Sequence, residues 1–172
     1  MADSLVFYSK SADVKPGKGV HECVRDPAAY AGLGQHWRRR LSNFDVGAFA
    51  FNGRTYMTIE HAFQAAKIAL ADARRAEEFT VESGTPLGMG DGAAAQRARK
   101  LVRLTPDLLR AWDGMKDDVM AAAAAEKFRA CPEAAAVLKA TGDAQLWHLS
   151  MQRGKASTLV RFIHLENIRE SL

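Results

Sequence analysis

The pattern of hydrophobic and polar positions is mostly helical from Thr58 to the end of the chain. Apolar residues recur there at intervals of three and four, which is the spacing of one helix face. Thr58 and Thr105 are predicted N-caps, and Pro106 suits the first position of a helix, where its missing N–H is not needed. The predicted helices cover about 59–70, 74–81, 93–103, 106–128, 132–140 and 157–169.

The first third of the chain has a different pattern. Residues 5–8 form a short apolar run that predicts an edge strand, and residues 11–36 are rich in proline and glycine, which predicts loops. Residues 49–56 predict a hairpin around Asn52-Gly53, a dipeptide well suited to a tight turn between antiparallel strands. The expected fold class is therefore α+β, predominantly α-helical, with a small N-terminal β element.

The composition is that of an ordinary soluble globular protein, with 48% hydrophobic and 26% charged residues in a chain of 172. A chain of this length buries about 70% of its unfolded surface, which predicts a single domain over residues 1–172. Within it, residues 1–36 form a loop-rich N-terminal segment. The net charge of +4 and the pI near 9.2 are compatible with a phosphate-bearing or nucleic-acid substrate, but too small to require one.

The cysteines and the N-terminus indicate the compartment and the need for cofactors. Cys23 and Cys131 form no CxxC pair, and no zinc-ligand spacing accompanies them. We therefore expect free thiols in a reducing compartment, no metal site and no other cofactor. The N-terminus lacks the features of a signal peptide, and no stretch approaches the ~18 apolar residues of a membrane span. We expect a cytoplasmic protein without membrane association.

The predicted helix over residues 59–70 has three functional side chains on one face. Glu60, Gln64 and Lys67 stand at i, i+4 and i+7, so an acid, an amide and an amine point the same way. Two helical turns separate Glu60 from Lys67 by about 10.5 Å along the axis, which is too far for the usual i, i+4 ion pair. The two charges could instead converge on a bound group, or simply be solvated. The opposite face is the expected core stripe, with Ile59, Phe63, Ala66 and Leu70.

Two segments in order, Leu41-Ser42-Asn43-Phe44 and Tyr56–Lys67, resemble the signature of the NADAR family, also called YbiA-like. That signature is an LSNF loop, a short strand-forming stretch with glycine, and a helix of the pattern Y-x-[ST]-x-E-H-x-F-Q-A-x-K. Matches continue along the chain, so the family core spans about residues 40–170; they are Trp112, Val119-Met120, Lys127-Phe128, Leu138, Thr141-Gly142-Asp143 and Leu146. The segment 146–154 departs from the family's usual L-V-E-x-S and W-G-x-G stretches.

The resemblance implies a YbiA-like multihelical domain that hydrolyses the N-glycosidic bond between a ribosyl group and a base. The favoured substrate is ADP-ribose attached to guanine bases of nucleic acid or nucleotides, because the chain is basic, has a cluster of arginines at 38–40 and is altered in its segment after Leu146. A functional pairing with an ADP-ribosyltransferase is then expected. One alternative is cleavage of ribosylamino-pyrimidine phosphates of riboflavin biosynthesis. Another is a non-catalytic module that binds ADP-ribose or a related nucleotide.

Under this resemblance Glu60 and Lys67 are the expected catalytic residues. Glu60 would stabilise an oxocarbenium-like transition state at the ribose C1′ or activate the attacking water. Lys67 would protonate or hold the leaving group, or attack C1′ to form a Schiff base. Gln64, between them, would position ribose hydroxyls. His61 points about 100° away around the helix and is expected to orient the site without taking part in catalysis.

The remaining expected substrate-binding residues flank this helix in the sequence or follow Leu146. Arg40, the last of three consecutive arginines, could hold a phosphate or belong to a solvated basic run. Asn43 could bind a ribose hydroxyl or base edge, or brace its loop. Phe44 could stack on a base or fill the core. Trp147 and His148 lie near the expected binding region, where an indole could stack on a base or simply be packed.

The glycines between residues 84 and 92 do not form a nucleotide-binding motif. Neither G-x-G-x-x-G nor GK[ST] is present, and no predicted strand precedes them. We expect a connector between helices.

Overall fold

The computed structural model describes residues 2–150 and 156–172. The chain divides into two compact units, Met1–Ser42 with Pro132–Leu172, and Asn43–Cys131. We call them the split unit and the continuous unit, and the prediction of a single domain remains a prediction. The α+β class with mostly helices is confirmed. In the described part of the chain, none of the helices has the length and apolar character needed to cross a membrane.

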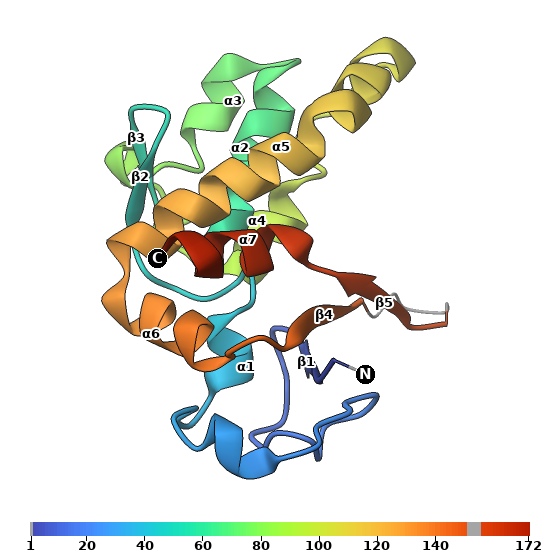
Figure 1. Ribbon diagram of the computed structural model, residues 1–172. Helices are drawn as coiled ribbons and strands as arrows, with labels where there is room; N and C mark the ends of the chain where they lie inside the picture. Colours follow the sequence, from blue (N-terminus) through green and yellow to red (C-terminus); the bar gives the residue numbers. More distant parts are fainter. Residues whose placement is uncertain (1, 151–155) are drawn as a thin grey trace. The chain divides into compact units, whose positions relative to one another are not determined.

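The split unit is built on a three-stranded sheet. Strand β4 lies in the middle, parallel to β1 and antiparallel to β5, so β1 is an edge strand as expected (Figure 1). The elements of this unit are β1 (Ser4–Phe7), a 3-10 turn (Pro27–Tyr30), α1 (Trp37–Arg40), α6 (Pro132–Ala140), β4 (Gln145–Ser150), β5 (Thr158–Arg161) and α7 (Ile163–Ser171).

Apolar side chains on β1 and β4 form the core of the split unit. Leu5, Phe7 and Leu146 are fully buried, as is Leu165 of α7. Burial of such side chains contributes roughly 1.5–3 kcal/mol each. The run 5–8 is therefore apolar because it forms part of the core even though it stands at the edge of its sheet.

The prediction of one helix over 157–169 is wrong at its start. Residues Thr158–Arg161 form strand β5, and the helix begins only at Ile163. Thr158, Leu159 and Val160 suit an extended chain, and they pair with Ser150, Leu149 and His148 of β4. Pairing with a distant strand thus prevails over a local pattern that favoured helix.

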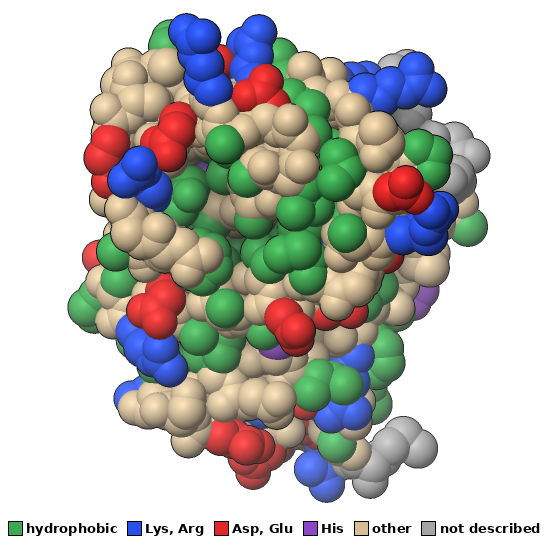
Figure 2. Space-filling view, turned by 90° about the horizontal axis from the view of Figure 1, so that it is seen from above, with side chains coloured by type: hydrophobic (Ala, Val, Ile, Leu, Met, Phe, Trp, Pro, Cys, Tyr) green, Lys and Arg blue, Asp and Glu red, His purple; other side chains and the backbone are tan. Residues whose placement is uncertain are grey.

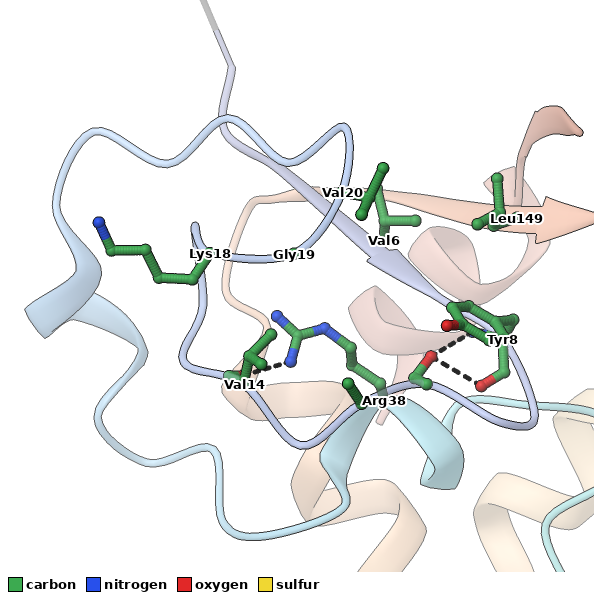
Figure 3. Close-up of a pocket in the computed structure, with 10 residues that line it drawn as sticks. Val6, Tyr8, Val14, Lys18, Gly19, Val20, Arg38 and Leu149 are labelled. Carbon is green, nitrogen blue, oxygen red and sulfur yellow. Dashed lines mark hydrogen bonds between the residues drawn. The ribbon is translucent and has the colours of Figure 1, made fainter.

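A buried ion pair holds the loops of residues 11–36 onto this sheet. The carboxylate of Glu22 accepts hydrogen bonds from the backbone N–H groups of Val6, Gly17 and Gly19 and from the guanidinium of Arg38. Both charged side chains are almost completely buried. Arg38 also donates to the carbonyl of Val14, as Figure 3 shows.

A cavity of about 150 Å³ lies beside Arg38. It is lined mainly by aliphatic side chains, among them Val6, Val20 and Leu149 (Figure 3).

The continuous unit consists of a hairpin and helices gathered around α2. The hairpin is confirmed, since β2 and β3 pair antiparallel and Asn52 and Gly53 both have positive φ, 48° and 74°, as a two-residue turn of this kind requires. The elements of this unit are β2 (Phe49–Phe51), β3 (Arg54–Tyr56), α2 (Ile59–Ala69), α3 (Ala73–Glu77), a 3-10 turn (Val81–Ser83), α4 (Gly92–Ala98) and α5 (Pro106–Ala130).

Helix starts in this unit follow the predicted caps. The hydroxyl of Thr58 accepts from the His61 N–H, the hydroxyl of Thr105 accepts from the Leu108 N–H, and Pro106 opens α5. The predicted helix 93–103 is shorter, because α4 ends at Ala98. These caps fix where α2 begins, and therefore where Glu60 is placed.

The expected burial of α2 is partly wrong. Ile59 is buried, but Phe63, Ala66 and Leu70 are only half-buried, whereas Glu60 and Gln64 on the predicted polar stripe are buried. The physical reason is that α3, α4 and α5 all pack against α2, so more than one of its faces is covered. The polar stripe is therefore an interior feature and not a solvated surface.

Candidate functional site

The start of α2 is braced by a chain of hydrogen bonds through His61. Its Nδ1 lies 2.8 Å from the Thr58 hydroxyl and its Nε2 lies 2.9 Å from the carbonyl oxygen of Leu87. Burial lowers the pKa of His61, so the ring is neutral at neutral pH. A neutral ring here can accept from Thr58 at Nδ1 and donate to Leu87 from Nε2. His61 thus holds the first turn of α2 against the segment that contains Leu87.

Glu60 stands in that first turn and is only 7% exposed. Its carboxylate accepts a hydrogen bond of 2.8 Å from Nε2 of Gln64, one turn further along the helix. Burial raises the pKa of Glu60 above its ordinary value, although the hydrogen bond from Gln64 and the charges of Arg99 and Lys67 act in the opposite direction. A carboxyl group with a raised pKa is suited to exchanging a proton during a reaction.

Two cations act on Glu60 from a distance. Lys67 is half-buried in the last turn of α2, and Arg99 follows the last residue of α4, which packs against α2. In the described part of the chain, neither side chain forms an ion pair or a hydrogen bond. Their charge is thus available to an anionic group on a ligand. Arg99 was not among the residues expected from the sequence, since it is 39 positions from Glu60 and lies in no recognised motif. Its side chain is exposed.

The loop that begins at Asn43 is joined to the start of α2. The carbonyl oxygen of Asn43 accepts a hydrogen bond of 3.0 Å from the N–H of Glu60. The Asn43 side-chain amide donates to the sulfur of Met120 on α5, at 3.3 Å. Asn43 therefore contacts both the candidate acid and the long helix.

Lys127 of α5 anchors the next residues of this loop. Its ammonium group donates to the carbonyl oxygens of Asp45 at 2.8 Å and Gly47 at 3.0 Å, and lies 3.5 Å from the Asp45 carboxylate. The Lys127 side chain is almost completely buried. A Cβ at Gly47 would come within 2.7 Å of the ammonium nitrogen, so glycine is required there by space. The loop after Asn43 is thereby fixed, and no sequence motif had pointed to Lys127 in this role.

Phe44 packs against the first residue of α4. A Cβ at Gly92 would lie 2.6 Å from Cα of Phe44, so backbone and ring come very close there. Phe44 is half-buried. The continuous unit contains five of the expected site residues, namely Asn43, Phe44, Glu60, Gln64 and Lys67. Glu60 is hydrogen-bonded to Asn43 through the backbone and to Gln64 through the side chain.

The other three expected binding residues belong to the split unit. Arg40 pairs with Glu133 at 2.9 Å. Trp147 and His148 are half-buried on β4. The ring of His148 stacks on Phe162 with centroids 5.0 Å apart, and burial lowers its pKa. His148 is therefore a neutral, packed ring at neutral pH.

The three consecutive arginines have three different environments. Arg38 is buried against Glu22, Arg39 donates to the carbonyl oxygen of Ser11, and Arg40 pairs with Glu133. Arg38 is therefore removed from solvent, whereas Arg39 is exposed and Arg40 is partly exposed. The altered segment 146–154 is described only as far as Ser150.

The glycine-rich connector is closely packed. A Cβ at Gly88 would lie 2.0 Å from the carbonyl oxygen of Thr80. Gly88 is therefore explained by packing. Among the residues that the structure describes, no cluster of three or more histidine, cysteine or acidic side chains is arranged to hold a metal ion.

Charged side chains of both signs are interspersed on the face shown in Figure 2, mostly toward its edge, while hydrophobic side chains gather in the middle. The described part of this face carries no continuous basic band of the kind that follows a nucleic-acid backbone.

Comparison with known proteins identifies the family. The family model described as the NADAR domain matches residues 24–153. A search of curated proteins gave no match. Among solved structures, the NMR structure of the E. coli protein YbiA is similar, with a TM-score of 0.56 and 22% sequence identity over 99% of this chain and 86% of that one. At this identity, the similarity to YbiA shows the fold alone. The family model covers most of the sequence, and the chain therefore belongs to the NADAR domain family.

Proposed function

We propose that the protein is an N-glycosidase that hydrolyses the bond between a ribosyl group and a base, with ADP-ribose on guanine as the substrate. The observation that carries this proposal is the buried carboxyl group of Glu60, with its raised pKa and with two cations acting on it that have no ion-pair partner among the described residues. Membership of the NADAR family supports the reaction class.

Cleavage requires a group that stabilises positive charge at C1′ and accepts a proton from water. As the bond from C1′ to the base nitrogen breaks, its electron pair leaves with the base and positive charge develops on the ribose. The carboxylate of Glu60 stabilises that charge and takes a proton from the water that attacks C1′. Lys67 donates a proton to the departing base, and the products are free ADP-ribose and guanine.

We propose that a cation of the same unit binds the phosphate groups of the substrate. Arg40, the arginine expected from the sequence to hold phosphate, already pairs with Glu133. Arg99 and Lys67 have no carboxylate partner in the described chain. A phosphate group bound at Arg99 would satisfy this cation through charge-assisted hydrogen bonds, which leaves Lys67 for the departing base.

The test is release of ADP-ribose from a guanine-ADP-ribosylated oligonucleotide by the wild type, Glu60→Gln and Lys67→Met. We expect release by the wild type, and a loss of about 10²–10⁴-fold in kcat for each variant, which is the usual contribution of an acid–base group. Glu126→Gln is a matched control, since it removes a half-exposed carboxylate of α5 that, among the described residues, pairs with Arg129. Its rate should match the wild type.

Other outcomes separate the alternatives. Release of ribose 5-phosphate from ribosylamino-pyrimidine phosphates, with no action on ADP-ribosyl guanine, would identify the riboflavin-type reaction. Binding of ADP-ribose without turnover of any ribosylated base would identify a non-catalytic module.

A further inference from the structure

The orientation of the Gln64 amide leaves one buried oxygen open. Only the NH₂ group of this amide can donate to the Glu60 carboxylate, at 2.8 Å, so the carbonyl oxygen Oε1 must face away from it. Gln64 is 5% exposed, and in the described part of the chain its Oε1 has no hydrogen-bond donor. A buried acceptor in this state costs about 1–3 kcal/mol.

The side chain of Asn43 has the same arrangement. Its NH₂ group donates to the sulfur of Met120, and a thioether sulfur can only accept, so Oδ1 is turned the other way. Oδ1 is also buried and without a donor among the described residues. Since unpartnered buried polar atoms are rare in folded proteins, two of them on residues hydrogen-bonded to Glu60 require an explanation.

The two open atoms share one property, since both accept hydrogen bonds and neither can donate. The carboxylate of Glu60 is an acceptor as well. A ligand that completes this site must therefore present hydroxyl or amino hydrogens toward it. Phosphate oxygens and base carbonyls would repel these atoms. A sugar hydroxyl supplies what is missing.

We infer that Gln64 Oε1 and Asn43 Oδ1 accept hydrogen bonds from the hydroxyl groups of the ribose whose C1′ is cleaved, and that Gln64 binds the hydroxyl on the adjacent carbon, C2′. This inference rests on the proposed function, in which Glu60 acts at C1′. The C2′ hydroxyl is assigned to Gln64 because this side chain is hydrogen-bonded to Glu60 and C2′ is bonded to C1′. Asn43 then takes the C3′ hydroxyl.

The consequence is selectivity for ribosyl over 2′-deoxyribosyl substrates. A site built to bind a substrate hydroxyl rejects the analogue that lacks it by as much as about 10⁴–10⁵-fold, because the protein acceptor is then buried without a partner. The glycosidic bond of a 2′-deoxyribosyl group is itself more labile. Each kcat/KM value is therefore divided by the uncatalysed rate for the same substrate before the two are compared.

The experiment uses ADP-ribosyl guanine with and without the C2′ hydroxyl on the ribose attached to guanine. We expect the wild type to prefer the ribosyl substrate by at least about 100-fold, within the range for a lost substrate hydroxyl. Gln64→Met, of similar length and without an amide, should bring this preference close to one. A purely structural role would lower both rates equally and leave the preference unchanged. Gln96→Met, which alters an exposed glutamine of α4, is the matched control and should keep the wild-type preference.

A second variant tests the other acceptor. Asn43→Leu should reduce the preference for the ribosyl substrate over a 3′-deoxy analogue, while its preference over the 2′-deoxy analogue stays near that of the wild type. Equal corrected kcat/KM values of the wild type for all three sugars would overturn the inference while leaving the glycosidase intact, even if neither variant folds. Absence of cleavage of every ribosylated base would overturn the proposed function, and the inference with it.

Discussion

Glu22 in the split unit and Glu60 in the continuous unit both have buried side chains, but they are held in opposite ways. Glu22 in the split unit accepts hydrogen bonds from three backbone N–H groups and from Arg38, with which it forms an ion pair of 2.8 Å. Among the described residues, the Glu60 carboxylate in the continuous unit accepts one hydrogen bond, from Gln64, and the cations that act on it lie further away. The first carboxylate is surrounded by donors, and the second is next to open acceptors.

This difference distinguishes a structural carboxylate from one suited to chemistry. A buried charge with a full set of donors fixes the segments that supply them, and it has no capacity left for a ligand. A buried charge with few donors is kept at a cost to stability, and a substrate can supply what is missing. The two glutamates should therefore respond in opposite directions to the same Glu→Gln substitution.

The largest effect is expected from Glu22→Gln. This substitution leaves Arg38 buried without its partner, and removing one member of a buried ion pair typically costs about 3–5 kcal/mol. Urea denaturation measures the free energy of unfolding. Glu77→Gln breaks the half-exposed pair with Arg54 and is the control, expected to change the transition little. Equal midpoints for the two variants would contradict the structural role of Glu22.

Lys127→Met should give the next largest effect. The part-buried carbonyl oxygens of Asp45 and Gly47 lose their donor, and a fully buried acceptor left unsatisfied costs about 1–3 kcal/mol, which sets the upper limit for each. Thermal unfolding measures the loss, and Lys116→Met, on the exposed side of the same helix, serves as control. An unchanged Tm would show that the loop after Asn43 does not depend on this anchor.

Glu60→Gln should stabilise the protein at neutral pH. Because burial raises the pKa of Glu60, the folded protein retains this proton at pH values where the unfolded chain has released it. The free energy of unfolding therefore falls as pH rises from the ordinary value of 4.5 through the raised pKa, and the cost is complete above it. The variant should gain a few degrees in Tm at pH 7, where about 1 kcal/mol corresponds to 2–4 °C in a domain of this size. The gain should vanish near pH 4.

A smaller effect should appear in the pH dependence of kcat/KM. As a base, Glu60 is active only when ionised, so activity should fall on the acid side with an apparent pKa above 4.5. Arg99 is one of the charges that hold this pKa down, so Arg99→Gln should move the acid limb to higher pH. High salt should weaken the effect, since Arg99 is exposed. Arg97→Gln, two residues earlier on α4, is the control, and an identical shift there would exclude a specific role for Arg99.

Local signals in the sequence predicted much of the continuous unit. Asn52-Gly53 identified the hairpin, and Thr58 and Thr105 identified the starts of α2 and α5. These features depend on turn geometry and on capping hydrogen bonds within three residues. Helical spacing likewise placed Gln64 beside Glu60, and the structure shows their hydrogen bond.

Features that depend on distant contacts were missed. Strand β4 was not predicted, because its partner β1 begins 141 positions earlier, at Ser4, which pairs with Gln145. Glu22 lies in a segment that reads as loop, and its role appears only with Arg38 and the backbone of β1. The burial of Glu60 depends on α3, α4 and α5, which no periodicity within α2 reports.

The continuous unit is unbroken along the sequence, which has a consequence for how it can be exchanged by recombination. It is a single uninterrupted stretch, Asn43–Cys131, and its last residue lies near its beginning, since the Cys131 thiol is 3.9 Å from the carbonyl oxygen of Ala48. Segments whose ends lie close together are tolerated as insertions into other chains. Recombination could therefore exchange it as one cassette. Glu60, Asn43, Gln64 and Lys67 would then be transferred together in one event, and the flanking sequence could diverge independently.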